Sequence, residues 1–247
     1  MKNIFFSLLI INTSFVFSIE ASNILYKTIE RFKGIDRYLL VEINEKKNNG
    51  KHKNRIFESW THWDSLGTKK ERVLMFKPDN LKGVNFWSHT KNGVTDKWMT
   101  LPKIGKLKKV KGRFGKKDDF DFSELELKED NIEGHVNSII GEEMVNDRFC
   151  YVITNVKKNK NGEIKSTRKI WVDKNDYIIH KVVYFNKKNK ITKEIFLTNL
   201  TSVNNNYVFK EIKINDIKKK KNILIKFSNI SFDKIIDLEM LEPKSLN

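Results

Sequence analysis

The stretch from Val73 to Leu125 reads VLMFKPDNLKGVNFWSHTKNGVTDKWMTLPKIGKLKKVKGRFGKKDDFDFSEL. It contains two runs rich in aromatic and β-forming residues, GVNFWSHT and DKWMTL, which predict neighbouring strands. A Leu-Pro step and a lysine-rich loop follow, and the acidic and aromatic segment DDFDFSEL predicts the start of a helix. No catalytic motif occurs in the stretch, which therefore predicts a β-sheet framework.

Residues 1–21 predict a cleavable signal peptide. Lys2 precedes an apolar run over residues 4–19, and cleavage after Ser18 or after Ala21 fits the pattern equally well. Polar residues interrupt the run, which is short for a membrane span. No cysteine lies near the junction and no second apolar run approaches the length of a span. We therefore expect an exported, soluble chain without a lipid anchor.

The remainder, residues 22–247, predicts one domain that opens with a helix. From Ser22 to Gly34 the apolar residues fall on one helical stripe, with Ser22 as the N-cap and Gly34 at the C-terminal end. A further helical segment is expected from Phe120 to Leu127, and another in the tail after Phe232.

From Tyr38 onward the chain changes to β-strand composition, with Lys, Asn and Gly residues between the runs. The runs are YLLVEINE, NRIFESWTHW, ERVLMF, GVNFWSHT, DKWMTL, HVNSIIGEEM, FCYVITNV, TRKIWV, YIIHKVVYF, TKEIFLTNL, NYVFKEIKI and ILIKFSNI. Most connections are too short for a crossover helix, so we expect an antiparallel, meandering sheet.

Several of these strands carry large apolar residues on both faces. In GVNFWSHT, Phe86 and Trp87 point to opposite faces, and in DKWMTL, Trp98 opposes Met99. An antiparallel sheet with one wet face alternates more cleanly, so both faces are expected to be at least partly covered. A curved sheet around an apolar cavity, a β-sandwich and a small closed barrel all satisfy this condition. The residue pattern alone does not choose among the three.

The formal net charge of +17 invites comparison with nucleic-acid-binding proteins. An exported chain whose lysines lie mostly in turns argues against nucleic acid as a partner. A solvated basic surface is the simpler expectation, and a surface that meets anionic lipid headgroups is the functional alternative. The single cysteine, Cys150, lies in an apolar strand pattern and predicts a buried, inert thiol.

Other chemistry has little support in the sequence. The five histidines are scattered without metal-ligand spacing, and GRFGKK lacks the spacing of a P-loop. Asp118, Asp119 and Asp121 lack the glycine and distant glutamate of a calcium loop. We therefore predict no catalytic residue, no metal site and no cofactor, and we expect that the protein is not an enzyme.

The order of three segments, FKPDNLKGVNFW, KWMTLPKIGKLKKVKG and DDFDFSEL, resembles the outer membrane lipoprotein-sorting family, whose members are similar to LolA-type periplasmic lipoprotein carriers. RKIWVDKNDYIIHKVVYF resembles the late hairpin of that family and SNISFDKIIDLEML its C-terminal end, so the resemblance extends from about Lys33 to Leu241. The positions that match the family pattern are Phe76, Pro78, Asp79, Gly83, Phe86, Trp98, Leu101, Pro102, Lys108, Lys109, Asp119, Phe120, Phe122, Glu124 and Leu125.

The resemblance implies an α+β, mainly β fold: a single curved antiparallel sheet that forms an incomplete, half-open barrel, with a few helices as a lid over an interior that accepts acyl chains. Candidate residues that line this apolar cavity or its rim are Phe86, Trp98, Met99, Leu101, Ile104 and Trp171. Plain hydrophobic core is the alternative for each of them. Candidate contacts to an anionic headgroup or an acidic partner are Lys106, Lys108, Lys109 and Lys111, for which a solvated hairpin is the alternative.

Three functions follow from these features. The first is a soluble periplasmic carrier that shields the acyl chains of a lipoprotein or lipid and transfers it between membranes, with an inner-membrane transporter and an anionic membrane surface as further partners. The second is a non-catalytic periplasmic sensor or adaptor subunit of a lipid-exporting membrane complex. The third is a structural envelope protein with a fully packed core.

Overall fold

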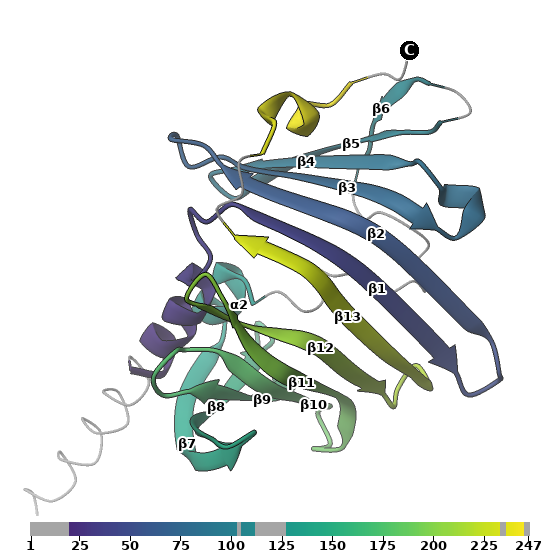
Figure 1. Ribbon diagram of the computed structural model, residues 1–247. Helices are drawn as coiled ribbons and strands as arrows, with labels where there is room; N and C mark the ends of the chain where they lie inside the picture. The colour runs from purple at the N-terminus through teal and green to yellow at the C-terminus, as the bar shows by residue number, and fades with distance from the viewer. Residues whose placement is uncertain (1–19, 103–104, 112–126, 233–235, 245–247) are drawn as a thin grey trace, which may run out of the picture. The chain divides into compact units, whose positions relative to one another are not determined.

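The computed structural model describes residues 20–102, 105–111, 127–232 and 236–244 (Figure 1). Its strands are β1 Arg37–Lys47, β2 His52–Trp63, β3 Lys69–Lys77, β4 Asn85–Lys91, β5 Val94–Thr100, β6 Leu107–Lys109, β7 Val136–Val145, β8 Arg148–Lys158, β9 Ile164–Asp173, β10 Ile179–Phe185, β11 Ile191–Val203, β12 Asn206–Asp216 and β13 Lys221–Phe232. Its helical elements are a helix over residues 20–30, η1 Asp79–Leu81, α2 Glu129–Glu133 and η3 Leu238–Leu241.

These strands form one sheet in the order β6-β5-β4-β3-β2-β1-β13-β12-β11-β10-β9-β8-β7. Each strand therefore neighbours the next one in the chain, except that β1 pairs with β13. In the described part of the chain β6 and β7 are the two edges and do not pair, so the sheet is not closed into a barrel. The prediction of a single open antiparallel sheet with few helices is confirmed.

Twelve of the strands were predicted, and β6 was not. It has only three residues, Leu107–Lys109, within the lysine-rich stretch after Pro102. Its strand conformation comes from pairing with β5, where Trp98 lies opposite Lys109 and Thr100 opposite Leu107. Tertiary pairing thus decides its conformation, and the composition of so short a segment gives no signal.

The described chain divides into two compact units. Unit 1 takes its residues from Met1–Arg31, Leu127–Thr198 and Lys213–Lys220, and unit 2 from Phe32–Glu126, Asn199–Ile212 and Lys221–Asn247. A single domain over residues 22–247 remains a prediction, and each unit is described by itself.

Unit 2 contains the meander β1–β6 together with β13. Alternate residues of β1, β2, β3 and β13 form its apolar core, in which each side chain is at most 6% exposed: Val41, Ile43, Phe57, Met75, Ile223 and Ile225. Phe32 stacks on Phe232 with ring centroids 5.5 Å apart, which fixes the chain where it enters β1.

The expected helix in the tail is the short η3, which begins at a cap where Asp237 accepts a hydrogen bond from the Glu239 backbone. Of the helix expected from Phe120 to Leu127, residues 120–126 lie outside the part of the chain that the structure describes.

Unit 1 contains the helix over residues 20–30, α2 and the strands β7–β10. The helix buries Leu25 completely and includes the buried Ala21, so it begins before Ser22. The expectation that Ser22 is the N-cap is wrong, because the Ser22 hydroxyl instead accepts a hydrogen bond from Asn137 Nδ2 at 3.1 Å. The helix ends at residue 30, earlier than the predicted end at Gly34, which lies at the close of the following turn with a φ of 79°.

None of the described helices is long and apolar enough to cross a membrane.

Candidate functional site

Five of the six predicted cavity residues fall in unit 2, four of them on or directly after the hairpin β4–β5. Phe86 lies on β4, Trp98 and Met99 on β5, and Leu101 directly after β5, and all four side chains are half-buried. Ile104 lies outside the described residues. The structure therefore brings most of the predicted set to one hairpin, and the strand register decides which of them share a face.

Phe86 and Met99 lie on one face of the sheet. Phe86 pairs with Met99 on β5 and with Val73 on β3, and Ser59 of β2 connects Val73 to Leu39 of β1. Residues directly opposite in an antiparallel ladder point to the same face. Leu39, Val73, Phe86 and Met99, which we call the apolar row, therefore lie in one line on β1, β3, β4 and β5, with Ser59 of β2 between Leu39 and Val73.

Trp98 lies on the other face. It pairs with Trp87, which pairs with Arg72, which in turn pairs with Trp60. We call Trp60, Arg72, Trp87 and Trp98 the tryptophan face. The Arg72 guanidinium lies 5.1 Å from the Trp60 ring centroid, and the His89 ring lies 5.1 Å from that of Trp98.

The C-terminal segment covers part of the tryptophan face. Trp87 Nε1 donates a hydrogen bond of 3.1 Å to the carbonyl oxygen of Met240, and His89 Nε2 lies 3.0 Å from the carbonyl oxygen of Leu241. The Thr100 hydroxyl donates to the carbonyl oxygen of Lys244. Trp87 is only 2% exposed as a result. The part of this face around Trp87 is thus occupied by the protein's own chain.

The Gly and Pro of the family-like motif meet at the base of the same hairpin. A Cβ on Gly83 would lie 2.9 Å from Pro102 Cγ, closer than side-chain carbons approach, and the Gly83 φ of 78° also favours glycine. Leu101 precedes this contact, and its carbonyl oxygen accepts a hydrogen bond from the Gly105 backbone. Gly83 and Pro102 therefore fix where the chain leaves β5.

The four predicted headgroup lysines are all exposed around the edge strand β6. Lys108 pairs with Met99 and so lies at the end of the apolar row. Lys109 belongs to the other face, where its ammonium group lies 2.6 Å from Asp96 and 5.7 Å from the Trp98 ring centroid. Lysines also protect an edge strand from pairing with another chain, so their position alone does not assign a function.

Trp171 lies in unit 1, in a packed cluster with Cys150, Val152 and Val183. Its Nε1 donates a hydrogen bond of 2.7 Å to Glu143, and the Lys181 ammonium group lies 4.4 Å from its ring centroid. Trp171 is 5% exposed. The structure thus places this residue in a core with both its apolar and polar groups satisfied.

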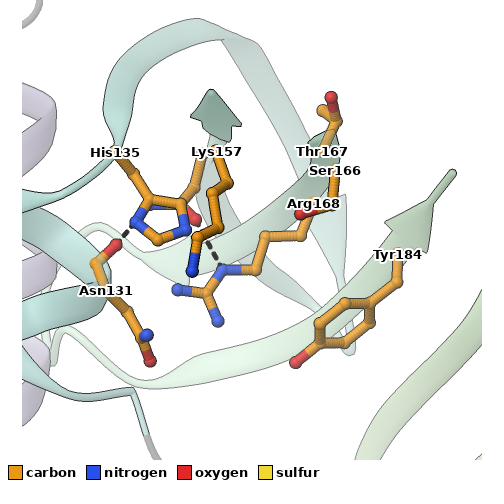
Figure 2. A pocket seen from close by; sticks show the side chains of 8 residues that line it. Asn131, His135, Lys157, Ser166, Thr167, Arg168 and Tyr184 are labelled. Atoms are coloured by element: carbon orange, nitrogen blue, oxygen red, sulfur yellow. Dashed lines mark hydrogen bonds between the residues drawn. The ribbon is translucent and has the colours of Figure 1, made fainter. Parts of the chain in front are cut away.

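A polar pocket in unit 1 was not predicted. Its volume is about 200 Å³ and its lining, which defines the term polar pocket below, comprises Asn131, His135, Asn155, Lys157, Ser166, Thr167, Arg168 and Tyr184 (Figure 2). The alternation of polar residues at Asn155 and Lys157, and at Ser166 and Arg168, is visible in the sequence. This alternation indicates a shared polar face only once the pairing of β8 with β9 is known.

Reactive groups are scarce in the described residues. Cys150 is fully buried, and burial together with the nearby Asp173 raises the pKa of its thiol to about 11. The thiol is therefore protonated near neutral pH, in agreement with the predicted inert cysteine. No group of three His, Cys, Asp or Glu side chains in the described part of the chain is arranged to hold a metal ion.

Comparison with known proteins gives the family. A family model with the description "uncharacterized protein" matches residues 67–247, which is most of the chain. The chain belongs to this family. No curated protein matches the sequence.

Solved structures share the fold over nearly the whole chain. A DUF1329 family protein from Desulfovibrio piger has a TM-score of 0.73 at 17% identity, covering 92% of this chain and 97% of the other. A domain from Vibrio parahaemolyticus, described as that of an outer membrane lipoprotein-sorting protein, has a TM-score of 0.72 at 18% identity, covering 91% and 97%. A LolA superfamily protein from Nitrosomonas europaea has a TM-score of 0.60 at 14% identity, covering 88% and 96%. The family resemblance seen in the sequence is thus confirmed in the fold.

Proposed function

We propose that this protein is a periplasmic carrier that shields the acyl chains of a lipoprotein or lipid and transfers them between membranes. The observation that carries the proposal is the apolar row. Its four side chains are half-buried, whereas the neighbouring core residues Val41, Phe57 and Met75 are at most 6% exposed. Apolar side chains that remain partly exposed provide the kind of surface that an acyl chain requires for binding.

Burial of an acyl chain supplies enough free energy for binding. Each methylene contributes about 0.8 kcal/mol, so a chain of ~16 carbons offers on the order of 10 kcal/mol before the costs of ordering are subtracted. A carrier also has to release its cargo, which favours an adaptable surface. Met99 is suited to this because its unbranched thioether side chain adjusts to irregular partners.

The shared fold supports the proposal. The Vibrio parahaemolyticus domain is described as part of an outer membrane lipoprotein-sorting protein, and the Nitrosomonas europaea protein belongs to the LolA superfamily. A signal peptide over residues 1–21 would deliver the chain to the periplasm. An acylated lipoprotein or lipid is then the cargo, and an inner-membrane transporter is the donor.

The basic residues around β6 fit the same role. Lys108 lies beside Met99, so an acyl chain along the apolar row would bring its headgroup toward Lys106, Lys108 and Lys111. Exposed lysines near an anionic membrane surface contribute about 1 kcal/mol each to attraction. We infer that this edge meets anionic headgroups during loading or release.

Native mass spectrometry of the mature protein, purified from the periplasm and extracted for lipids in parallel, tests the proposal. We expect a co-purifying acylated molecule, and displacement of a fluorescent fatty-acid probe by that molecule. A clean apo mass together with no binding of the probe would contradict the carrier function.

A further inference from the structure

The polar pocket of unit 1 carries chemistry that the carrier proposal does not use. We propose that it binds an oxyanion, namely a phosphate group that is either free or part of a small headgroup. The proposal is independent of acyl-chain binding, because every residue involved belongs to unit 1 and none belongs to the apolar row.

Strand register builds the floor of the pocket. Asn155 on β8 pairs with Arg168 on β9, and Arg168 pairs with Tyr184 on β10, so these three side chains share a face. The two-residue period of a strand places Lys157 and Ser166, which pair with each other, on the same face. α2 and the residues after it add Asn131 and His135 from the side (Figure 2).

A buried asparagine orients the guanidinium group of Arg168. Asn155 is 1% exposed, and its Oδ1 accepts a hydrogen bond of 2.7 Å from Arg168 Nε. Its Nδ2 donates to the carbonyl oxygen of Asn131 at 2.8 Å and to Asn137 Oδ1 at 2.6 Å. Because every polar atom of the Asn155 amide is engaged, its Oδ1 is fixed toward Arg168. The guanidinium group is therefore held in one orientation before any ligand arrives.

Two nitrogen atoms at the site remain without partners. Arg168 Nη2 and His135 Nδ1 are buried and form no hydrogen bond within the described residues. Arg168 Nη2 is a charged donor that loses its hydration without compensation, whereas His135 Nδ1 is a donor only when the imidazole is protonated. A ligand that supplies acceptor oxygens would remove this cost.

The charge of the pocket selects an anion. None of the eight lining residues has a carboxylate, and each side chain carries N–H or O–H groups that donate. Within the described chain neither Lys157 nor Arg168 forms a salt bridge. A further cation lies near the pocket, since the Lys193 ammonium group is 5.4 Å from the Tyr184 ring centroid. Planar, forked guanidinium donors match the geometry of a phosphate.

The pKa of His135 reflects the positive charge of the pocket. Burial lowers the pKa of His135 below its ordinary value, and the positive charges of Arg168 and Lys157 lower it further, although a hydrogen bond that the imidazole donates to the backbone of Asp130 opposes the shift. The imidazole is therefore neutral near pH 7. A bound anion would offset the repulsion and favour the protonated form, so binding and protonation of His135 support each other.

The size of the pocket limits the ligand. About 200 Å³ holds roughly six water molecules at about 30 Å³ each, which suffices for a phosphate group with some of its waters. It is smaller than the ~300–1,000 Å³ of pockets that enclose drug-sized molecules. The ligand is thus an oxyanion or the tip of a headgroup, and the pocket is too small for a whole lipid.

Isothermal titration calorimetry of the mature full chain at low salt tests the proposal. The probes are inorganic phosphate and dihexanoyl phosphatidic acid below its micelle concentration. We expect binding that weakens at least about tenfold in Arg168→Gln and in Lys157→Met, because each removes a charge-assisted contact. The matched control is Lys165→Met, an exposed lysine on β9 outside the lining, which should change affinity less than about twofold.

The two probes distinguish the source of the phosphate. Equal affinities indicate a free oxyanion, whereas tighter binding of the lipid probe that still depends on Arg168 indicates a headgroup. Sulfate, which does not titrate in this range, should bind more tightly at about pH 6 than at about pH 8, and His135→Gln should remove that difference. Absence of binding by all three probes, or equal losses in Lys157→Met and Lys165→Met, would overturn the proposal. Inorganic phosphate and sulfate have no acyl chain to place on the apolar row, so a failure of the carrier function would leave their binding unchanged.

Discussion

The apolar row of unit 2 and the floor of the polar pocket in unit 1 are built in the same way and present opposite surfaces. Each is a line of side chains that lie opposite one another on adjacent antiparallel strands. In unit 2 the line includes Val73, Phe86 and Met99, and in unit 1 it is Asn155, Arg168 and Tyr184. The strand register fixes which residues lie opposite one another. The side chains at every second position of each strand then determine whether that face suits an acyl chain or an anion.

The two units also differ in whether their cations have carboxylate partners. In unit 2, Lys221 Nζ donates a hydrogen bond of 2.9 Å to Glu45 Oε2, and the two residues are 3% and 1% exposed. In unit 1 the cations of the polar pocket have no carboxylate partner among the described residues. In the first arrangement each buried charge is compensated within the fold, and the second leaves charge available to a ligand.

Breaking the buried pair of unit 2 should have the largest effect. Lys221→Met leaves the Glu45 carboxylate buried without its partner, which we expect to lower the free energy of unfolding by about 3–5 kcal/mol. Urea denaturation measures the change. The double variant Glu45→Met with Lys221→Met should recover much of the loss, since it leaves no uncompensated charge. A loss below about 1 kcal/mol in the single variant would show that the pair is not a structural element.

Removing the asparagine that orients Arg168 should cost less. Asn155→Ala deletes three hydrogen bonds in a buried network and leaves Arg168 Nε without an acceptor, so we expect a loss of about 2–3 kcal/mol. Phosphate binding should weaken in the same variant, because the guanidinium group is no longer held. Asn161→Ala, in an exposed turn, is the control. Unchanged phosphate affinity in a folded Asn155→Ala protein would contradict the positioning role.

His180 of unit 1 predicts a pH dependence of stability. Burial lowers the pKa of this fully buried imidazole, and the charge of Arg148 lowers it further, while Asp173 and Asp176 act in the opposite direction. The native state therefore resists protonation more than the unfolded chain does. Its contribution to stability is complete above the ordinary histidine pKa of about 6.5 and is lost as the pH falls below it.

Denaturation at a series of pH values measures this effect. Between about pH 7 and pH 5 the free energy of unfolding should fall less steeply in His180→Gln than in the unaltered protein. His135→Gln separates the contribution of the other histidine whose pKa is lowered. A slope that neither substitution changes would show that other groups cause the acid sensitivity.

The lysines around β6 should give the smallest effect. Replacement of Lys106, Lys108, Lys109 and Lys111 by Ser should weaken binding to anionic vesicles a few-fold at low salt, and the difference should vanish at high salt. Co-sedimentation with vesicles measures it. The matched control replaces four other exposed lysines, Lys187, Lys188, Lys190 and Lys218. Equal losses in both variants would make the β6 lysines ordinary surface.

The sequence predicted most of the fold because its signals are local. Alternating apolar residues and Lys, Asn or Gly turns located twelve strands, and the two-residue period correctly placed Trp98 opposite to Met99. The prediction grouped both residues in one cavity lining or rim, and the strand register places them on opposite faces of β5. The first helix was placed too late because its true start lies within the predicted signal peptide.

The sites depend on information that is not local. The polar pocket exists because Asn155, Arg168 and Tyr184 fall in register on three strands, and spacing within one strand does not fix register between strands. β6 likewise owes its conformation to pairing with β5. The burial of Trp171 also follows from packing, although its strand was predicted correctly.

The central claim is that the apolar row, and not the tryptophan face, binds acyl chains. Met99 and Trp98 are adjacent, half-buried and on opposite faces, so Met99→Glu and Trp98→Glu form a matched pair. The direct test is titration of both folded variants with a fluorescent fatty-acid probe. We predict that Met99→Glu weakens binding at least about tenfold, because a charge would have to be buried against the chain, and that Trp98→Glu changes it less than about twofold. Loss of binding in Trp98→Glu with full binding in Met99→Glu would contradict the account.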